Sequence, residues 1–162
     1  MKNVRFALAI VIALLIQGCS INKSSEQFMP NYAIDPEGLF KVPGFHQVMV
    51  SNGNKTIYIA GQVAYDRDMN LIGAGDYRAQ TIKAFQNVAI AANAAGAKPE
   101  DVVSSTLHIK GLSTEVAQEI MEAMAVALNG KPFPAHAFNM IGVDALADPR
   151  ILIEVSAVAI VE

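Results

Sequence analysis

The fold is decided by the stretch Ile151-Leu152-Ile153-Glu154-Val155-Ser156-Ala157-Val158-Ala159-Ile160-Val161. Its β-branched and other apolar side chains are typical of a strand, and they occur on both faces of that strand. Two apolar faces have to be covered from two sides. We therefore expect helices against one face of its sheet and another copy of the chain against the other.

The sequence before this strand predicts alternating strands and helices. Ser51–Lys55 contains Asn52-Gly53, the strongest short hairpin signal, so the strands on either side of it should pair as an N-terminal hairpin. Helical spacing of apolar residues predicts one helix from Asp76 to Gly96 and a second from Ser113 to Asn129-Gly130. The expected strands are 46–50, 56–64, 102–109, 135–141 and 151–161. The order β-β-α-β-α-β-β predicts a single α+β domain with both helices on one face of a mixed sheet.

Composition excludes several classes of protein. The chain has 162 residues, of which 52% are hydrophobic and 17% charged, enough for one compact core. A formal charge of −3 argues against nucleic acid as a partner. One cysteine and three histidines far apart in the sequence give no metal-ligand spacing, so no metal site is expected.

Residues 1–18 have the features of an export signal. Lys2 and Arg5 precede the apolar run 6–16, which is too short for the roughly 20 residues of a membrane-spanning helix. The sequence Leu15-Ile16-Gln17-Gly18-Cys19 resembles a bacterial lipoprotein signal, which implies cleavage before Cys19 and its lipidation. An ordinary secretory signal with an incidental cysteine is the alternative.

We interpret residues 19–36 as a tether and residues 37–162 as the domain. Cleavage would leave 10 basic against 15 acidic residues, a charge of −5. Ser20, where an aspartate could stand, favours the outer membrane by resemblance to enterobacterial lipoprotein sorting. We therefore expect a periplasm-facing lipoprotein of the cell envelope, attached to the membrane through its lipid alone.

Glu154 and His136 are the first candidates for chemistry. A carboxylate on an apolar strand is costly unless it is paired, hydrogen-bonded or protonated. His136 shares one face of its strand with Phe138 and Met140. If both strands border one cleft, a carboxylate and an imidazole converge and can move protons. The alternative is a solvent-exposed glutamate and a core histidine satisfied by the backbone. His108, between Leu107 and Ile109, fits a structural role in the sheet.

Four motifs, in this order, resemble the RidA/YjgF family: Ile59-Ala60-Gly61-Gln62, Asn93-Ala94-Ala95-Gly96, Phe133-Pro134-Ala135 and Ile153–Ala159. The resemblance covers about Phe40 to Val161. It implies a chorismate-mutase-like fold and a homotrimer, a trimeric barrel with small-molecule clefts between subunits. Deaminases of this family hydrolyse reactive 2-imino or enamine acids to 2-oxo acids and ammonia without a cofactor.

The resemblance also implies roles for single residues. Glu154 matches a glutamate that holds or activates water, and Gly61 matches a glycine that frames the ligand. A site serine is replaced by Ala60 and an aromatic hydroxyl by Phe45. The arginine that clamps the substrate carboxylate is replaced by His136.

Two more residues complete the expected substrate-binding set, which is Phe45, Ala60, Gly61, Glu119 and Phe138. Glu119 stands where the deaminases tend to have a neutral amide, which would make the cleft less favourable for an anion.

These departures leave two functions open. The first is hydrolysis of reactive imines or enamines, in which Glu154 activates water and His136 anchors the substrate or shuttles a proton. Alternatively the chain is a binding protein, or acts on a different substrate, and recognises a neutral or cationic small molecule. A ribonuclease activity is disfavoured by the export signal and by the negative charge.

Overall fold

The main sheet of the protein has four strands in the order β3-β6-β4-β5. The computed structural model describes residues 31–34, 43–44, 48–51 and 53–162. The strands are β3 (Lys55–Gln62), β4 (Val102–Lys110), β5 (Ala137–Val143) and β6 (Ile153–Val161). β4 and β5 are parallel, whereas β6 is antiparallel to both β3 and β4.

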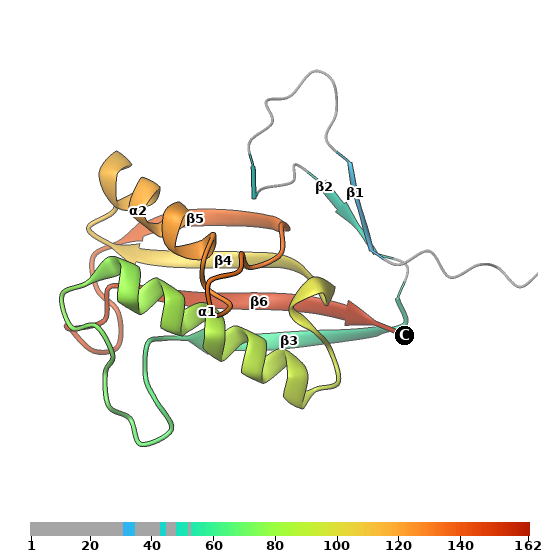
Figure 1. Cartoon of the computed structure of the whole chain (residues 1–162), viewed down its shortest axis with the longest axis horizontal. Helices are drawn as coiled ribbons and strands as arrows, with labels where there is room; N and C mark the ends of the chain where they lie inside the picture. Colours follow the sequence, from blue (N-terminus) through green and yellow to red (C-terminus); the bar gives the residue numbers. More distant parts are fainter. Residues whose placement is uncertain (1–30, 35–42, 45–47, 52) are drawn as a thin grey trace, which may run out of the picture.

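Helices α1 (Tyr77–Ala94) and α2 (Thr114–Met124) cover one face of this sheet (Figure 1). A single turn of 3₁₀ helix, η1 (Pro99–Asp101), leads from α1 into β4. The expected α+β architecture, with two helices on one face of a mixed sheet, is confirmed. Within the described part of the chain, no helix is both long and apolar enough to span a bilayer.

Strict alternation along β6 separates the two faces of the sheet. Ile153, Val155, Ala157 and Ala159 are buried among the core side chains beneath the helices. The residues between them, Glu154 among them, are only half-buried, because they point to the face that carries no helix. We call this second side the helix-free face.

The two helices begin at the capping residues that the sequence indicates. Asp76 accepts a hydrogen bond from the Ala79 backbone amide at 2.8 Å, and Ser113 accepts one from the Val116 amide at 3.2 Å. Gly96 follows α1 with φ +86°, the left-handed conformation that glycine adopts at helix ends.

The expected hairpin between residues 46–50 and 56–64 is wrong for the residues described. Strand β2 (Val48–Val50) pairs with β1 (Tyr32–Ile34), and β3 pairs with β6 instead. Gly53 lacks the positive φ that a two-residue Asn-Gly turn requires. A Cβ at Gly53 would collide with Ile160 and Val161, so this glycine permits a close approach to the end of β6. Strand β1 lies within the segment 19–36 that the sequence suggested as a tether.

The second helix is also shorter than expected. It ends at Met124, whose carbonyl accepts a hydrogen bond from the Phe133 amide at 2.9 Å. Asn129 and Gly130, with φ of 53° and 84°, form the tight turn of a small hairpin in which Leu128 pairs with Lys131. This Asn-Gly pair therefore makes a turn of its own and does not cap the helix.

Gln80 ties α1 to the entry of β6. Its side chain is fully buried, donates to the carbonyls of Gly73 and Arg150 at 3.0 Å each, and accepts from the Leu152 amide at 2.8 Å. One amide side chain therefore bonds three backbone groups, of which the Gly73 carbonyl also accepts from the Asp76 amide at 3.0 Å.

We predict that Gln80→Ala lowers the free energy of unfolding by about 3 kcal/mol, because it removes the side-chain partner of the Arg150 carbonyl and of the Leu152 amide. Urea denaturation measures the change. Gln118→Ala, which removes an exposed amide bonded to Glu122, is the matched control and should cost less than about 0.5 kcal/mol. Equal losses in the two variants would contradict the role assigned to Gln80.

Candidate functional site

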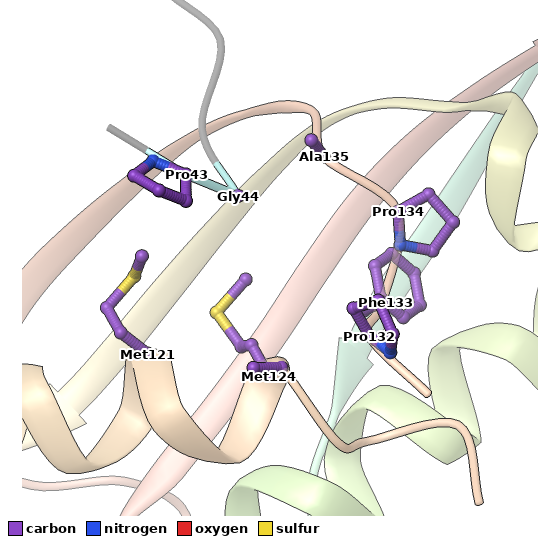
Figure 2. A pocket seen from close by; sticks show the side chains of 9 residues that line it. Pro43, Gly44, Met121, Met124, Pro132, Phe133, Pro134 and Ala135 are labelled. Carbon is purple, nitrogen blue, oxygen red and sulfur yellow. The ribbon is translucent and has the colours of Figure 1, made fainter. Parts of the chain in front are cut away.

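A pocket of about 360 Å³ lies between the C-terminal half of α2 and the segment that leads into β5 (Figure 2). It brings Pro43-Gly44, directly before Phe45, next to Phe133-Pro134-Ala135, directly before His136. Two motifs that are about 90 residues apart in the sequence therefore border one cavity. The lining residues are Pro43, Gly44, Met121, Met124, Ala125, Pro132, Phe133, Pro134 and Ala135.

None of the lining residues that the structure describes has a charged or strongly hydrogen-bonding side chain. Met121 and Met124 project from α2 toward Pro43 and Gly44, and Phe133 closes the other side (Figure 2). Phe133 is itself held from below by Phe85, with ring centroids 4.8 Å apart. Flexible thioether side chains adapt to apolar ligands of irregular shape. The pocket is therefore suited to an uncharged, apolar molecule.

His136 lies beside this pocket but is fully buried, with 0% of its surface exposed. Its Nε2 is 2.8 Å from the Ser105 hydroxyl, and its Nδ1 is 2.7 Å from the Pro134 carbonyl oxygen. A carbonyl can only accept, so Nδ1 carries a proton. In the neutral ring, Nε2 then accepts from the Ser105 hydroxyl. The imidazole also stands edge-on to Phe133, with centroids 5.4 Å apart, and 5.7 Å from Phe138.

Within one chain, Glu154 lies on the opposite face of the sheet from His136. Glu154 is the cross-strand partner of His108, whose neighbours Leu107 and Ile109 are fully buried under the helices. Glu154 and His108 are both half-buried and share the helix-free face. The structure therefore does not bring Glu154 and His136 together within a chain, and the imidazole that shares a face with Glu154 is that of His108.

The Glu154 side chain packs directly against Gly61. A Cβ added to Gly61 would overlap the carboxyl group and Cγ of Glu154, so only glycine leaves room for this side chain in its present position. Among the described residues, none donates a hydrogen bond to the Glu154 carboxylate. The two residues matched by resemblance, Gly61 and Glu154, are therefore in direct contact.

The other expected site residues have different surroundings. Glu119 accepts a hydrogen bond from the Arg78 backbone amide at 3.2 Å, where a carboxylate stabilises the first turn of α1. Phe138 is partly buried and packs against the core. Ala60 is exposed, one residue before Gly61 on β3. Phe45 and Cys19 lie outside the described residues.

An ion pair between Arg150 and Asp148 fixes the loop before β6. Asp148 accepts three hydrogen bonds from the side chain of Arg150 and one from the Tyr65 hydroxyl, at 2.6–3.2 Å. Hydrogen bonding to Arg150 holds the pKa of the Asp148 carboxyl well below its usual range. Because the folded pKa is lowered, this interaction stabilises the fold above the ordinary aspartate pKa, and the contribution is lost as the pH falls through the folded value. Among the residues described, no three potential metal ligands cluster, here or elsewhere.

Comparison with known proteins identifies the family. A family model described as Endoribonuclease L-PSP matches residues 41–161. The chain belongs to this family. It is the RidA/YjgF family that the sequence motifs resemble, so that resemblance is confirmed. No significant match was found among the curated proteins.

Solved structures of the Rid family share the fold. A Rid-family protein of unknown function from Yersinia pestis, YyfB, is 32% identical, with a TM-score of 0.72 over 82% of this chain and 100% of its own. RidA from the Antarctic bacterium Psychrobacter is 25% identical, with a TM-score of 0.55 over 69% of this chain and 88% of its own. A putative endoribonuclease from Thermotoga maritima is 22% identical, with a TM-score of 0.55 over 80% and 92%, which supports the fold alone.

Sequence reasoning missed two features of this Rid-family site. It did not single out Ser105, although a serine among the buried apolar positions of a strand is itself a signal. It assigned His108 a structural role, and only the β4–β6 register shows that His108 stands opposite Glu154.

We predict that Gly61→Ala displaces the Glu154 carboxylate while costing less than about 1 kcal/mol of stability, because the flexible glutamate side chain can move aside. The ¹³C chemical shift of the Glu154 carboxyl carbon measures the displacement. Gly142→Ala is the control, because a Cβ there meets only Leu112 at an ordinary 3.4 Å. A Glu154 signal that is unchanged in Gly61→Ala would refute the contact.

Proposed function

We propose that this Rid-family protein binds a small, uncharged and largely apolar molecule in the pocket beside Phe133, and that it does not turn over 2-imino acids. One observation carries the proposal: the described residues that line the pocket between the Gly44 and Ala135 segments are all apolar, and His136 is buried behind it with both ring nitrogens hydrogen-bonded. The position that holds the carboxylate-clamping arginine in the deaminases, by the resemblance, then supplies no cation to the ligand.

The replacement of that arginine by His136 has a large expected effect on the binding of a carboxylate. An arginine offers a permanent charge and a planar two-pronged donor, whereas an inward-turned imidazole whose two nitrogens are already hydrogen-bonded offers a carboxylate no such contact. Loss of such a bidentate contact costs about 2 to 4 kcal/mol of binding. This corresponds to roughly 30- to 1,000-fold in affinity for a carboxylate ligand. A deaminase of amino-acid-derived imines cannot readily dispense with that contact.

The size and walls of the pocket indicate the class of ligand. A volume of about 360 Å³ lies within the usual range for small-molecule sites. Because the described lining residues carry no charged or strongly hydrogen-bonding side chain, their backbone groups are the polar contacts that they offer. A neutral ligand with a compact apolar body satisfies these conditions.

Binding of neutral and anionic probes tests the proposal. By NMR titration, the protein should bind indole or cyclohexanol at least about tenfold more tightly than butanoate. Ala125→Trp should fill the pocket from its exposed rim, directly after the end of α2, and abolish binding. Glu122→Trp, on the same helix but outside the pocket, is the matched control and should bind as the wild type does. Equal affinity for butanoate, or binding undisturbed in Ala125→Trp, would contradict the proposal.

Imine hydrolysis remains a second candidate, and the position of Glu154 favours it. The half-buried carboxylate rests on Gly61 without a hydrogen-bond donor among the described residues. Glu154 would take a proton from water while the water oxygen bonds to the imine carbon and the C=N electron pair moves to nitrogen, which then takes up that proton. Transfer of the remaining hydroxyl proton to nitrogen and cleavage of the C–N bond release ammonia and leave the carbonyl compound.

A coupled assay separates the two candidates. 2-Iminobutanoate is generated with an amino-acid oxidase, and the appearance of 2-oxobutanoate is followed. We expect no acceleration by the wild type over buffer. Acceleration that Glu154→Ala abolishes would establish the hydrolase and overturn the binding proposal. Turnover gained in His136→Arg would show that the missing cation is what prevents the reaction.

Assembly and location are further proposals. A homotrimer would cover the helix-free face, where Tyr58 is 81% and Ile141 45% exposed. The family resemblance supports this arrangement, with ligand clefts between subunits. The signal at residues 1–18 supports export and lipidation at Cys19, with the domain facing the periplasm from the outer membrane. No cofactor and no nucleic acid enters the proposed function.

A further inference from the structure

We infer that Ser105 is the positioning residue that determines the specificity of the pocket, because it holds His136 turned away from the ligand. This inference rests on the proposed function and names the residue that excludes carboxylates. Ser105 touches no part of the pocket beside Phe133 and acts only through the imidazole.

Ser105 is the exception in its row of side chains. It lies on the helix side of β4 with Leu107 and Ile109, which are both buried and apolar. Ser105 is 2% exposed, and its cross-strand partners are Phe138 and Ala157. An apolar side chain would fit these surroundings, whereas a hydroxyl needs a partner. That partner is Nε2 of His136, at 2.8 Å.

The hydrogen bonds hold the ring at two points. The Pro134 carbonyl fixes the proton on Nδ1, and the Ser105 hydroxyl then supplies the donor that Nε2 needs. Turning the ring toward the pocket would break both contacts and leave a buried hydroxyl and a carbonyl without these partners. The rings of Phe133 and Phe138 pack against the imidazole in its inward position.

Removal of the Ser105 hydroxyl would weaken the inward position of His136. Without that donor, Nε2 can replace the lost hydrogen bond with water or a ligand. The pocket wall at Phe133-Pro134-Ala135 directly precedes His136, so this pocket is the cavity next to which we expect an outward-turned ring to lie. There a protonated imidazole adds a cation, and the pocket gains affinity for carboxylates at low pH.

Three serine variants test the inference. Ser105→Ala removes the hydroxyl, Ser105→Thr keeps it at the cost of one added methyl group, and Ser104→Ala removes the neighbouring hydroxyl on the helix-free face. Long-range ¹H–¹⁵N NMR reports the tautomer of His136, and butanoate titrations at pH 5.5 and pH 8 report anion binding. All four proteins are measured as the full domain under identical conditions.

In the wild type, Ser105→Thr and Ser104→Ala, we expect the Nδ1–H tautomer and no butanoate binding at either pH. In Ser105→Ala, the nitrogen shifts of His136 should change, and butanoate should bind at least about tenfold more tightly at pH 5.5 than at pH 8. A merely structural role would not produce this pH profile.

Unchanged His136 nitrogen shifts and no butanoate binding in Ser105→Ala would overturn the inference. Failure of the proposed function looks different, because the wild type itself would then bind butanoate or accelerate 2-iminobutanoate hydrolysis. The NMR signature of His136 in Ser105→Ala is independent of which ligand the pocket takes.

Discussion

The alternation of side chains along the two central strands, β6 and β4, is the constraint on which the rest of the structure depends. One face of both strands packs against α1 and α2, so every second residue is committed to the core. The residues between them form the helix-free face. Glu154 and His108 belong to that face, whereas Ser105 and the imidazole of His136 belong to the core. No rotation of side chains moves a residue from one face to the other.

This division separates two chemical environments in one small domain. On the helix side, a serine, a histidine and a backbone carbonyl satisfy one another and leave the adjoining pocket apolar. On the other side, a carboxylate rests on a glycine opposite a second histidine. The Rid-family fold is therefore retained, and this distribution of polar groups is the basis of the proposal that the pocket beside Phe133 takes a neutral ligand.

Much of the fold could be predicted because its signals are local. Helix caps at Asp76 and Ser113 need only a few neighbouring residues, and the apolar pattern of β6 predicts its two faces. The Asn52-Gly53 hairpin failed because the position of Gly53 depends on a close approach to Val161, more than 100 residues away. The hydrogen bond between Ser105 and His136 could not be predicted for the same reason. It depends on the parallel register of β4 and β5, which joins residues far apart in the sequence. The motif order gave the family, but only the fold shows which motifs share a pocket.

A crystal structure of the mature protein in its solution assembly tests the account most directly. The account predicts that the imidazole of residue 136 lies within hydrogen-bonding distance of the Ser105 hydroxyl in every subunit, on the opposite side of the sheet from the carboxylate of its own chain. An imidazole turned into a cleft, facing Glu154 of the same or of a neighbouring subunit, would contradict it.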